Sequence, residues 1–233
     1  MFYATGTDIG KVRTNNEDYV YARENIMIVA DGMGGHNAGE VASRIAVETA
    51  VEILSGIKEN YIENIKVAIE TANEKVFSMA TGERAGMGTT MDICIYSAGK
   101  LFLGHVGDSR VYAIRNGEAI RITSDHSYVE MLLSKGEITK EEAENYPMKH
   151  MITRAVGVGE KTECDFYEFD IEENDKILLC TDGLTNMVKD EDIADIVTKA
   201  EVPEEAVGNL IIRANEAGGK DNISAIVVQG FDK

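Results

Sequence analysis

The sequence predicts an α+β protein in which layers of antiparallel sheet are covered by helices. Helical patterns occur in pairs and strand patterns occur in runs, whereas a repeated βαβ sheet would alternate them one by one. Turn-forming residues at Gly99 and at Asn116-Gly117 separate short strand-like segments, as in antiparallel hairpins. The 233 residues contain no internal repeat and no break in composition. We therefore expect one domain, residues 1–233.

The first part of the chain should contain one buried strand and two long helices. Residues 26–30 form an apolar run of the length of a buried strand. Apolar residues then recur at steps of three and four, which places them on one face of each helix. The first face consists of Val41, Ala42, Ile45, Ala46, Ala50, Ile53 and Leu54, and the second of Ile62, Ile65, Ile69, Ala72 and Val76.

Most of the remaining elements are short strands, and the first three should form an antiparallel meander because turn residues separate them. These strands are Met91–Ser97, Lys100–Val106 and Arg110–Arg115. A polar segment at 127–153 should hold one short helix within a long excursion, and such excursions are often functional. We then expect a strand at 176–181, helices at 190–200 and 204–217, and a last strand at 223–229.

The charge balance is strongly acidic, with 41 Asp and Glu against 23 Lys and Arg. This excess argues against nucleic acid or an anionic membrane as a partner and fits divalent cations and basic protein segments. No apolar stretch has the length of a membrane helix or follows a basic N-terminus, so we expect a soluble cytoplasmic protein. We also expect it to be a monomer. The three cysteines, Cys94, Cys164 and Cys180, should be small buried apolar side chains rather than a disulfide framework.

Three aspartates beside predicted strands indicate a metal site. Asp31 and Asp182 each follow an apolar strand and precede a glycine, and Asp221 precedes the last strand. A single Asp-Gly pair is typical of a turn. If the strand ends converge, however, unpaired carboxylates would repel one another, and bound divalent metal would offset this repulsion. Oxygen ligands favour Mg²⁺ or Mn²⁺ over Zn²⁺, for which His or Cys would be expected.

Two further segments carry charged side chains. Arg13 lies five residues before Asp18 in a segment rich in Gly and Asn. Its guanidinium could bind a phosphate through two donors, or it could pair on the surface with Glu17 or Asp18. Asp108 lies in a Gly-Asp-Ser-Arg segment, which should join two strands of the meander as a hairpin.

Taken in order, these segments resemble the bacterial type 2C protein phosphatases, the metal-dependent family of protein serine/threonine phosphatases. The resemblance covers the chain from about residue 8 to its end, with seven matching motifs in the order of the family. They are R-x-x-N-E-D from Arg13, D-G-M-G-G-H from Asp31, G-T-T from Gly88, G-D-S-R from Gly107, D-H-S from Asp125, T-D-G-L from Thr181, and D-N at Asp221.

The resemblance implies a four-layer αββα sandwich and a centre of two Mn²⁺ or Mg²⁺ ions with a third, weaker one. In that family pattern Asp31 bridges two ions, and the carbonyl of Gly32 completes the shell of one. The pattern assigns Asp182 and Asp221 to the other ion. It further implies that Glu17 and Asp18 hold metal-bound waters, that Asp108 binds the third ion, and that 127–153 is a mobile flap.

The reaction implied is hydrolysis of phosphoserine and phosphothreonine in proteins, in opposition to a serine/threonine protein kinase. Two cations lower the pKa of a bridging water, so that hydroxide can attack phosphorus near neutral pH. The metals and Arg13 would neutralise charge on the phosphate oxygens. A proton donor must help the alkoxide to leave, and His36 is the candidate general acid.

The sequence lacks the motifs that two other classes of protein would require. A cysteine phosphatase needs an arginine six residues after its cysteine, and the corresponding positions hold Lys100, Asp170 and Asn186. A calcium-binding protein would show D-x-D-x-D-G loops, which the sequence lacks. The alternative that stays open is a catalytically inactive phosphoprotein-binding module of the same fold, although Asp31, Asp182 and Asp221 are all present.

Overall fold

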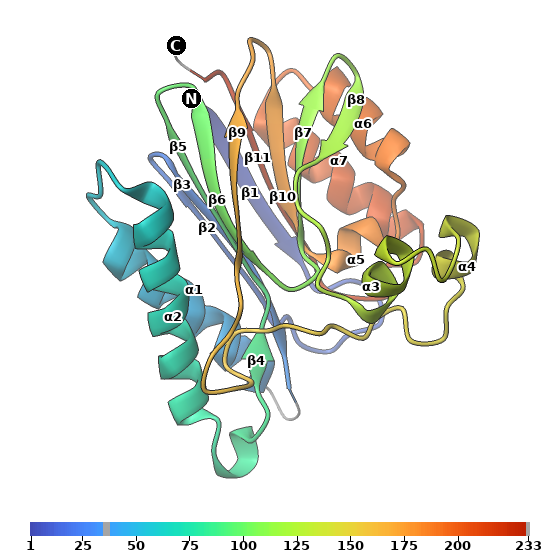
Figure 1. Ribbon diagram of the computed structural model, residues 1–233. Helices are drawn as coiled ribbons and strands as arrows, with labels where there is room; N and C mark the ends of the chain where they lie inside the picture. Colours follow the sequence, from blue (N-terminus) through green and yellow to red (C-terminus); the bar gives the residue numbers. More distant parts are fainter. Residues whose placement is uncertain (35–37, 232–233) are drawn as a thin grey trace.

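Two antiparallel sheets stack face to face in the computed structural model, which describes residues 1–34 and 38–231 (Figure 1). The first sheet has the order β1 (Phe2–Asp8), β11 (Ile223–Gln229), β10 (Lys176–Cys180), β7 (Arg110–Arg115) and β8 (Glu118–Arg121). The second has the order β2 (Asp18–Arg23), β3 (Ile26–Met33), β5 (Met91–Ser97), β6 (Lys100–Val106) and β9 (Asp165–Asp170), with β4 (Gly88–Thr89) paired to β3.

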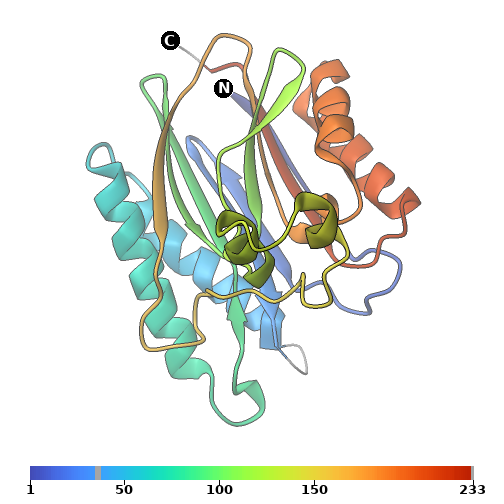
Figure 2. The ribbon, with the colours of Figure 1, turned by 45° about the vertical axis from the view of Figure 1, so that its right-hand side comes forward.

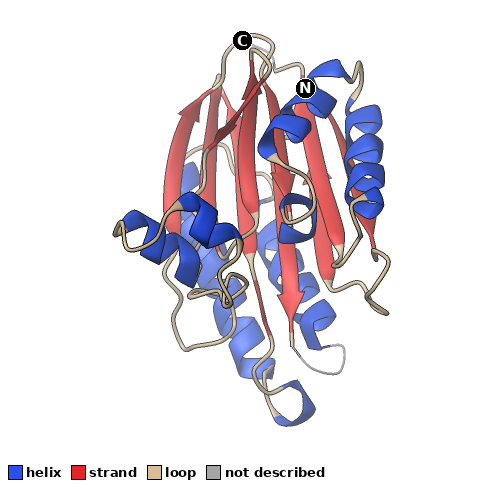
Figure 3. Cartoon of the chain, turned by 90° about the vertical axis from the view of Figure 1, so that its right-hand side faces the viewer, coloured by secondary structure: helices blue, strands red, loops and turns tan. Residues whose placement is uncertain are grey.

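A pair of helices covers the outer face of each sheet (Figures 1 and 2). The sheet that contains β3 is covered by α1 (Ala38–Leu54) and α2 (Tyr61–Met79), and the other by α6 (Asp190–Lys199) and α7 (Pro203–Glu216). The shorter helices are η1 (Gly82–Arg84), α3 (Tyr128–Ser134), α4 (Lys140–Glu144) and α5 (Asp182–Thr185). Figure 1 views the sheets edge-on as the two middle layers, which confirms the predicted αββα sandwich. Figure 3 looks onto the sheets, with one pair of helices in front of them and the other behind.

The apolar run at 26–30 shows how the layers are built, because β3 is buried on both faces. Ile26, Ile28 and Ala30 pack with the residues of α1 and α2. Met27 and Val29 point the other way and pack between the two sheets. Successive side chains of a strand alternate between its faces, so a strand buried on both sides needs an unbroken apolar run.

The four predicted long helices and the hairpins at Gly99 and at Asn116-Gly117 are confirmed. The helical faces predicted in the first half of the chain belong to α1 and α2, and those near the C-terminus belong to α6 and α7. Ala98 and Gly99 turn the chain between β5 and β6 with φ of 48° and 79°. Asn116 and Gly117 do the same between β7 and β8 with φ of 52° and 82°. Two consecutive positive φ values suit the twist of a tight hairpin.

The predicted meander is wrong, because β6 and β7 lie in different sheets. β6 pairs with β5 and β9, whereas β7 pairs with β10 and β8. Residues 107–109 therefore carry the chain from one sheet to the other, and they do not form a hairpin. Both strands are buried, and a run of short strands does not reveal where the chain changes sheet. The crossing begins at Gly107, whose φ is 113°.

Several short or mixed elements were not predicted from the sequence. They are β1, β2, β4, β8 and β9, together with α5, and the excursion at 127–153 contains two helices rather than one. Of the cysteines, Cys94 and Cys180 are buried as predicted and Cys164 is half-buried. Within the described ranges, no helix combines the length and the apolar character needed to cross a membrane.

Candidate metal centre

Five carboxylates approach one another where the two sheets meet. Asp18 and Asp31 lie directly opposite each other in the pairing of β2 with β3. Asp182 is the first residue of α5 and follows β10 of the other sheet, and Asp221 lies shortly before β11. Asp108 lies in the crossover from β6 to β7. The sequence placed Asp31 beyond its strand, but the structure places it inside β3.

The electrostatics of this cluster are those of like charges held close together. Burial, with the charges of Asp18 and Asp182, raises the pKa of Asp31 well above its ordinary value. Burial also raises the pKa of Asp182, and the charge of Asp221 raises it further. For Asp108, burial and the charge of Asp182 raise the pKa to about 8, and burial raises that of Asp18 to about 7. Within the described residues, the positive charge beside these carboxylates does not offset their mutual repulsion.

The donor set fits a hard divalent cation. Oδ2 of Asp18 accepts a hydrogen bond from Thr181 Oγ1 at 2.9 Å, whereas its buried Oδ1 has no hydrogen-bond partner in the described structure. A buried unpaired carboxylate oxygen is costly, and a cation would satisfy it directly or through a bound water. Oxygen ligands of this kind suit Mg²⁺ or Mn²⁺. Among residues 1–34 and 38–231, however, no three His, Cys, Asp or Glu side chains form a ready ligand set.

The backbone of Asp31 is fixed by the two threonines of the G-T-T motif. Asp31 N–H donates to Thr90 Oγ1 at 2.9 Å, and Thr90 N–H donates back to the carbonyl of Asp31 at 2.9 Å. Thr89 Oγ1 donates to the same carbonyl at 2.9 Å. The hydroxyl of Thr90 also bonds Ser109 of the G-D-S-R segment at 2.8 Å. Residues of the G-T-T and G-D-S-R motifs thus hold Asp31 of the D-G-M-G-G-H motif in place.

Gly32 and Gly39 let the start of α1 approach β3. A Cβ on Gly32 would lie 2.1 Å from the carbonyl oxygen of Gly39, and one on Gly39 would lie 2.8 Å from the carboxylate of Glu17. Gly32 N–H donates to the carbonyl of Glu17 at 3.1 Å. Any side chain at either glycine would push these segments apart. Glu17, whose pKa is raised by burial, is thereby held beside Asp31 and Gly32.

Asn222 connects the N-terminal segment to the other sheet. Its Oδ1 accepts the N–H of Glu17 at 2.9 Å, and its Nδ2 donates to the carbonyls of Ile9 and Asn15 at 3.0 and 2.9 Å. The D-N motif marked this residue in the sequence without indicating a role. Thr181 was likewise visible only as part of the T-D-G-L motif, although its hydroxyl bonds Asp18.

Arg13 lies at the exposed edge of the cluster. Its Nη2 donates to Asp221 Oδ2 at 2.8 Å, so its hydrogen-bond partner in the described structure is Asp221, although the charge of Glu17 also acts on it. About half of the side chain is accessible, at 52%. The guanidinium therefore has donors free to face a ligand at the same edge. The remaining predicted residue, His36, lies outside the described residues.

Comparisons with known proteins agree with this site. The model of the protein phosphatase 2C family matches residues 5–211. Protein phosphatase PhpP of Streptococcus pneumoniae is 38% identical over 236 residues, which cover 95% of this chain and 94% of the relative. The crystal structure of the serine/threonine phosphatase PstP/Ppp of Mycobacterium tuberculosis superposes with a TM-score of 0.92 at 36% identity, and 97% of each chain is covered.

A second structure, the catalytic domain of the phosphatase PstP in complex with 2 manganese ions, is also similar. It has a TM-score of 0.90 at 36% identity and covers 99% of this chain and 98% of its own. The match to the family model spans most of the chain, and the match to PhpP covers nearly the whole of both proteins. This chain therefore belongs to the bacterial serine/threonine phosphatases of the protein phosphatase 2C family.

Proposed function

We propose that this chain removes phosphate from phosphoserine and phosphothreonine side chains of proteins with two bound Mn²⁺ or Mg²⁺ ions. The observation that carries the proposal is the buried carboxylate cluster between the two sheets. The charges of Asp18 and Asp182 both raise the pKa of Asp31, so side chains from both sheets act on one site. The 2 manganese ions in the structure of PstP support the same number here.

The ligands we propose follow from their positions in the cluster. Asp31, the carbonyl of Gly32, Asp182 and Asp221 would hold the two ions. Glu17 and Asp18 would act through bound waters: Thr181 already occupies one oxygen of Asp18, and a metal-bound water would donate to the other. Asp108, whose pKa is raised by burial and by the charge of Asp182, would bind a third ion.

Bound divalent cations supply a water of lowered pKa and offset the charge of the phosphate. The chain itself supplies position and charge around them. The threonines that fix the backbone of Asp31 keep its carboxylate in place without a loop rearrangement. Arg13, beside Asp221 at the exposed edge, would bind the phosphate oxygens through two donors. His36 would donate the proton to the leaving alkoxide.

We further propose that residues 1–233 form one catalytic domain in which 127–153 act as a flap over the substrate. One interaction brings this segment near the cluster: the charge of His150 lowers the pKa of Asp182, against the larger effects of burial and of Asp221. Substrates would be phosphorylated proteins, among them a serine/threonine protein kinase whose action the enzyme opposes.

The test is phosphate release from a phosphothreonine peptide by metal-stripped protein, with and without Mn²⁺. We expect activity only with Mn²⁺, and we expect Asp182→Asn to lower kcat at least about a hundredfold because a ligand of the reaction centre is lost. Asp195→Asn is the matched control, since Asp195 is an exposed residue of α6 that pairs only with Lys199 in the described structure. An autophosphorylated serine/threonine kinase then serves as a protein substrate.

Each outcome has a distinct meaning. Metal-dependent release that Asp182→Asn abolishes and Asp195→Asn preserves supports the proposal. Binding of the phosphopeptide without release, in protein that binds Mn²⁺, would replace it with the inactive binding module. Release that survives Asp182→Asn would reject the ligand assignment.

A further inference from the structure

The two ends of the flap, residues 127–153, run side by side. Ser127 and Ile152 form an isolated antiparallel bridge. Thr153 N–H donates to the carbonyl of His126 at 2.7 Å, and Tyr128 N–H donates to that of Met151 at 2.9 Å. We call residues 126–128 and 151–153 the neck. The flap can keep one orientation only if the neck is fixed to the body of the protein.

His126 fixes the first end of the neck to the crossover that carries Asp108. Its N–H donates to the carbonyl of Gly107 at 2.7 Å, and the N–H of Gly107 donates to His126 Nδ1 at 3.1 Å. Because Nδ1 accepts a hydrogen bond, a neutral imidazole carries its proton on Nε2. Nε2 can then donate to Asp165 Oδ2, which lies 3.1 Å away. The ring is buried, and this burial lowers its pKa, in keeping with the neutral form.

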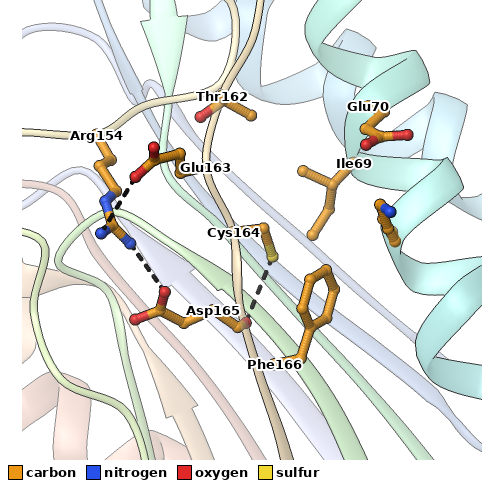
Figure 4. Close-up of a pocket in the computed structure, with 9 residues that line it drawn as sticks. Ile69, Glu70, Arg154, Thr162, Glu163, Cys164, Asp165 and Phe166 are labelled. Carbon is orange, nitrogen blue, oxygen red and sulfur yellow. Dashed lines mark hydrogen bonds and ion pairs between the residues drawn. The ribbon is translucent and has the colours of Figure 1, made fainter.

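Arg154 fixes the second end of the neck to the same carboxylate. It follows the flap directly, and its Nη1 donates to Asp165 Oδ1 at 2.8 Å. The guanidinium lies between Asp165 and Glu163, whose Oε2 is 3.4 Å from Nη2 (Figure 4). Nη1 also lies 3.0 Å from His126 Nε2. Since both nitrogens carry protons in this arrangement, the acceptor that joins them is Asp165.

Asp165 stands on a rigid element. It is the first residue of β9 and pairs with His105 of β6 in the sheet. The ring of His105 also packs on that of His126, with centroids 4.5 Å apart. Burial alone would raise the pKa of Asp165, but hydrogen bonds from His126 and Arg154 hold it below its ordinary value. The carboxylate of Asp165 therefore binds both ends of the flap: Oδ2 contacts His126 and Oδ1 contacts Arg154.

We propose that Asp165 is a positioning residue for the phosphatase reaction, which fixes the neck of the flap against the Gly107 turn and so sets the orientation of the flap over a protein substrate. The inference rests on the proposed function, in which the flap contacts substrate. A small aryl phosphate fills only the reaction centre, so its hydrolysis should not depend on the orientation of the flap. A phosphopeptide extends beyond that centre, so its binding should depend on the orientation of the flap.

The experiment compares Asp165→Asn with Glu163→Gln in the intact chain with Mn²⁺. The asparagine keeps the shape of Asp165, but its amide can accept from only one of the two donors and presents N–H groups to the other. Glu163 lines the same pocket as Asp165 and also pairs with Arg154, at a longer distance and with 83% of its side chain exposed. It makes no hydrogen bond to His126 in the described structure, so it is a matched control.

We expect kcat/KM for a phosphothreonine peptide to fall about tenfold in Asp165→Asn, the usual scale for losing one charge-assisted hydrogen bond, mainly through a higher KM. Turnover of an aryl phosphate should change less than about twofold, because the cluster stays intact. Trypsin should cut the flap at the exposed Lys135 and Lys140 about tenfold faster, since the neck opens more often. Glu163→Gln should match the unmodified chain in all three measurements.

The outcomes separate this inference from the function on which it rests. If the unmodified chain shows no metal-dependent release from either substrate, the proposed function fails. If it is active and Asp165→Asn has an unchanged KM and unchanged trypsin cleavage, the positioning role is rejected. Equal losses on both substrates would also reject it, because they would indicate general damage to the reaction centre.

Discussion

The side-chain oxygen of Asn222 accepts the backbone N–H of Glu17 at 2.9 Å, although the two residues lie 205 positions apart. The same side chain donates to the carbonyls of Ile9 and Asn15, so one buried amide joins the N-terminal segment to the strand end beside Asp221. The two halves of the carboxylate cluster come from different sheets. This amide is one of the contacts that keep them at a fixed separation.

We therefore expect Asn222→Ala to destabilise the metal-free protein by about 2–3 kcal/mol, because it leaves buried backbone groups without partners. Urea unfolding of metal-stripped protein measures the loss. Activity should also need more Mn²⁺, since Glu17 and Asp18 would no longer be held beside Asp221. The control is Asn64→Ala, whose exposed amide bonds only nearby carbonyls, at Glu59 and Asn60, in the described structure. Similar losses in both variants would contradict the joining role.

Asp108 should make the metal-free protein less stable as the pH rises. Burial and the charge of Asp182 raise its pKa to about 8 in the folded state. An unfolded aspartate has a pKa of about 3.9, so between about pH 4 and pH 8 the folded state retains a proton that the unfolded state has lost. The stability contribution of this group is therefore greatest below about pH 4 and falls as the pH rises through that window.

Asp108→Asn removes this penalty, so the metal-free variant should melt a few degrees above the unmodified chain at pH 8. The gain should shrink toward pH 4, and added Mn²⁺ should reduce it because the cation then stabilises the ionised carboxylate. Calorimetry at several pH values gives the comparison, with Asp195→Asn as a variant of an exposed aspartate. A gain that does not depend on pH would show that the effect is not electrostatic.

His36 stays a prediction from the sequence, and substrate dependence tests it. A phosphoserine peptide releases an alkoxide that needs a proton, whereas an aryl phosphate releases a phenoxide that does not. His36→Ala should therefore lower kcat about a hundredfold for the peptide and much less for the aryl phosphate. His150→Ala is the comparison, since the charge of His150 affects Asp182 from the flap. Selective loss in His150→Ala instead would move the proton donor to the flap.

The elements predicted well from the sequence are those with a clear local pattern, such as regular apolar spacing or turn-forming residues. The faces of α1 and α2 follow from their apolar spacing, and the turn at Asn116-Gly117 follows from residues that accept positive φ. The edge strands β1, β2 and β9 were missed because one side of an edge strand lacks neighbours, so its composition is mixed. In β9, half-buried and exposed residues alternate along Asp165–Asp170, a pattern that a period-two search could have found.

The charged residues of the site could be predicted from the sequence, but the hydrogen bonds that hold them in position could not. Asp31 and Asp182 stand out in the sequence because each follows an apolar run and precedes a glycine. The hydrogen bonds from Thr181 to Asp18 and from Asn222 to Glu17 join residues 163 and 205 positions apart, and no local pattern encodes such pairs. The change of sheet between β6 and β7 was missed for the same reason, since pairing between distant strands decides it.

The crossover at Gly107 allows a test of how tightly Thr90, which bonds the backbone of Asp31, is packed. Gly107 has φ of 113°, and a Cβ there would lie 2.5 Å from Thr90 Cγ2 and 3.1 Å from Thr90 Cα. Gly117 has φ of 82° with nothing within 4 Å of a Cβ. Alanine at Gly117 should thus cost only the backbone strain, about 1 kcal/mol.

Alanine at Gly107 should cost at least about 3 kcal/mol, because it adds a clash with Thr90 to the same kind of strain. Because Thr90 Oγ1 accepts the N–H of Asp31 at 2.9 Å, a shift of Thr90 would disturb this bond. Gly107→Ala should therefore also raise the Mn²⁺ concentration needed for half-maximal phosphate release, whereas Gly117→Ala should leave it unchanged. Equal unfolding free energies for the two variants would mean that the contact between Gly107 and Thr90 does not constrain the site. A larger loss with unchanged Mn²⁺ dependence would mean that Thr90 supports the fold and not the carboxylate.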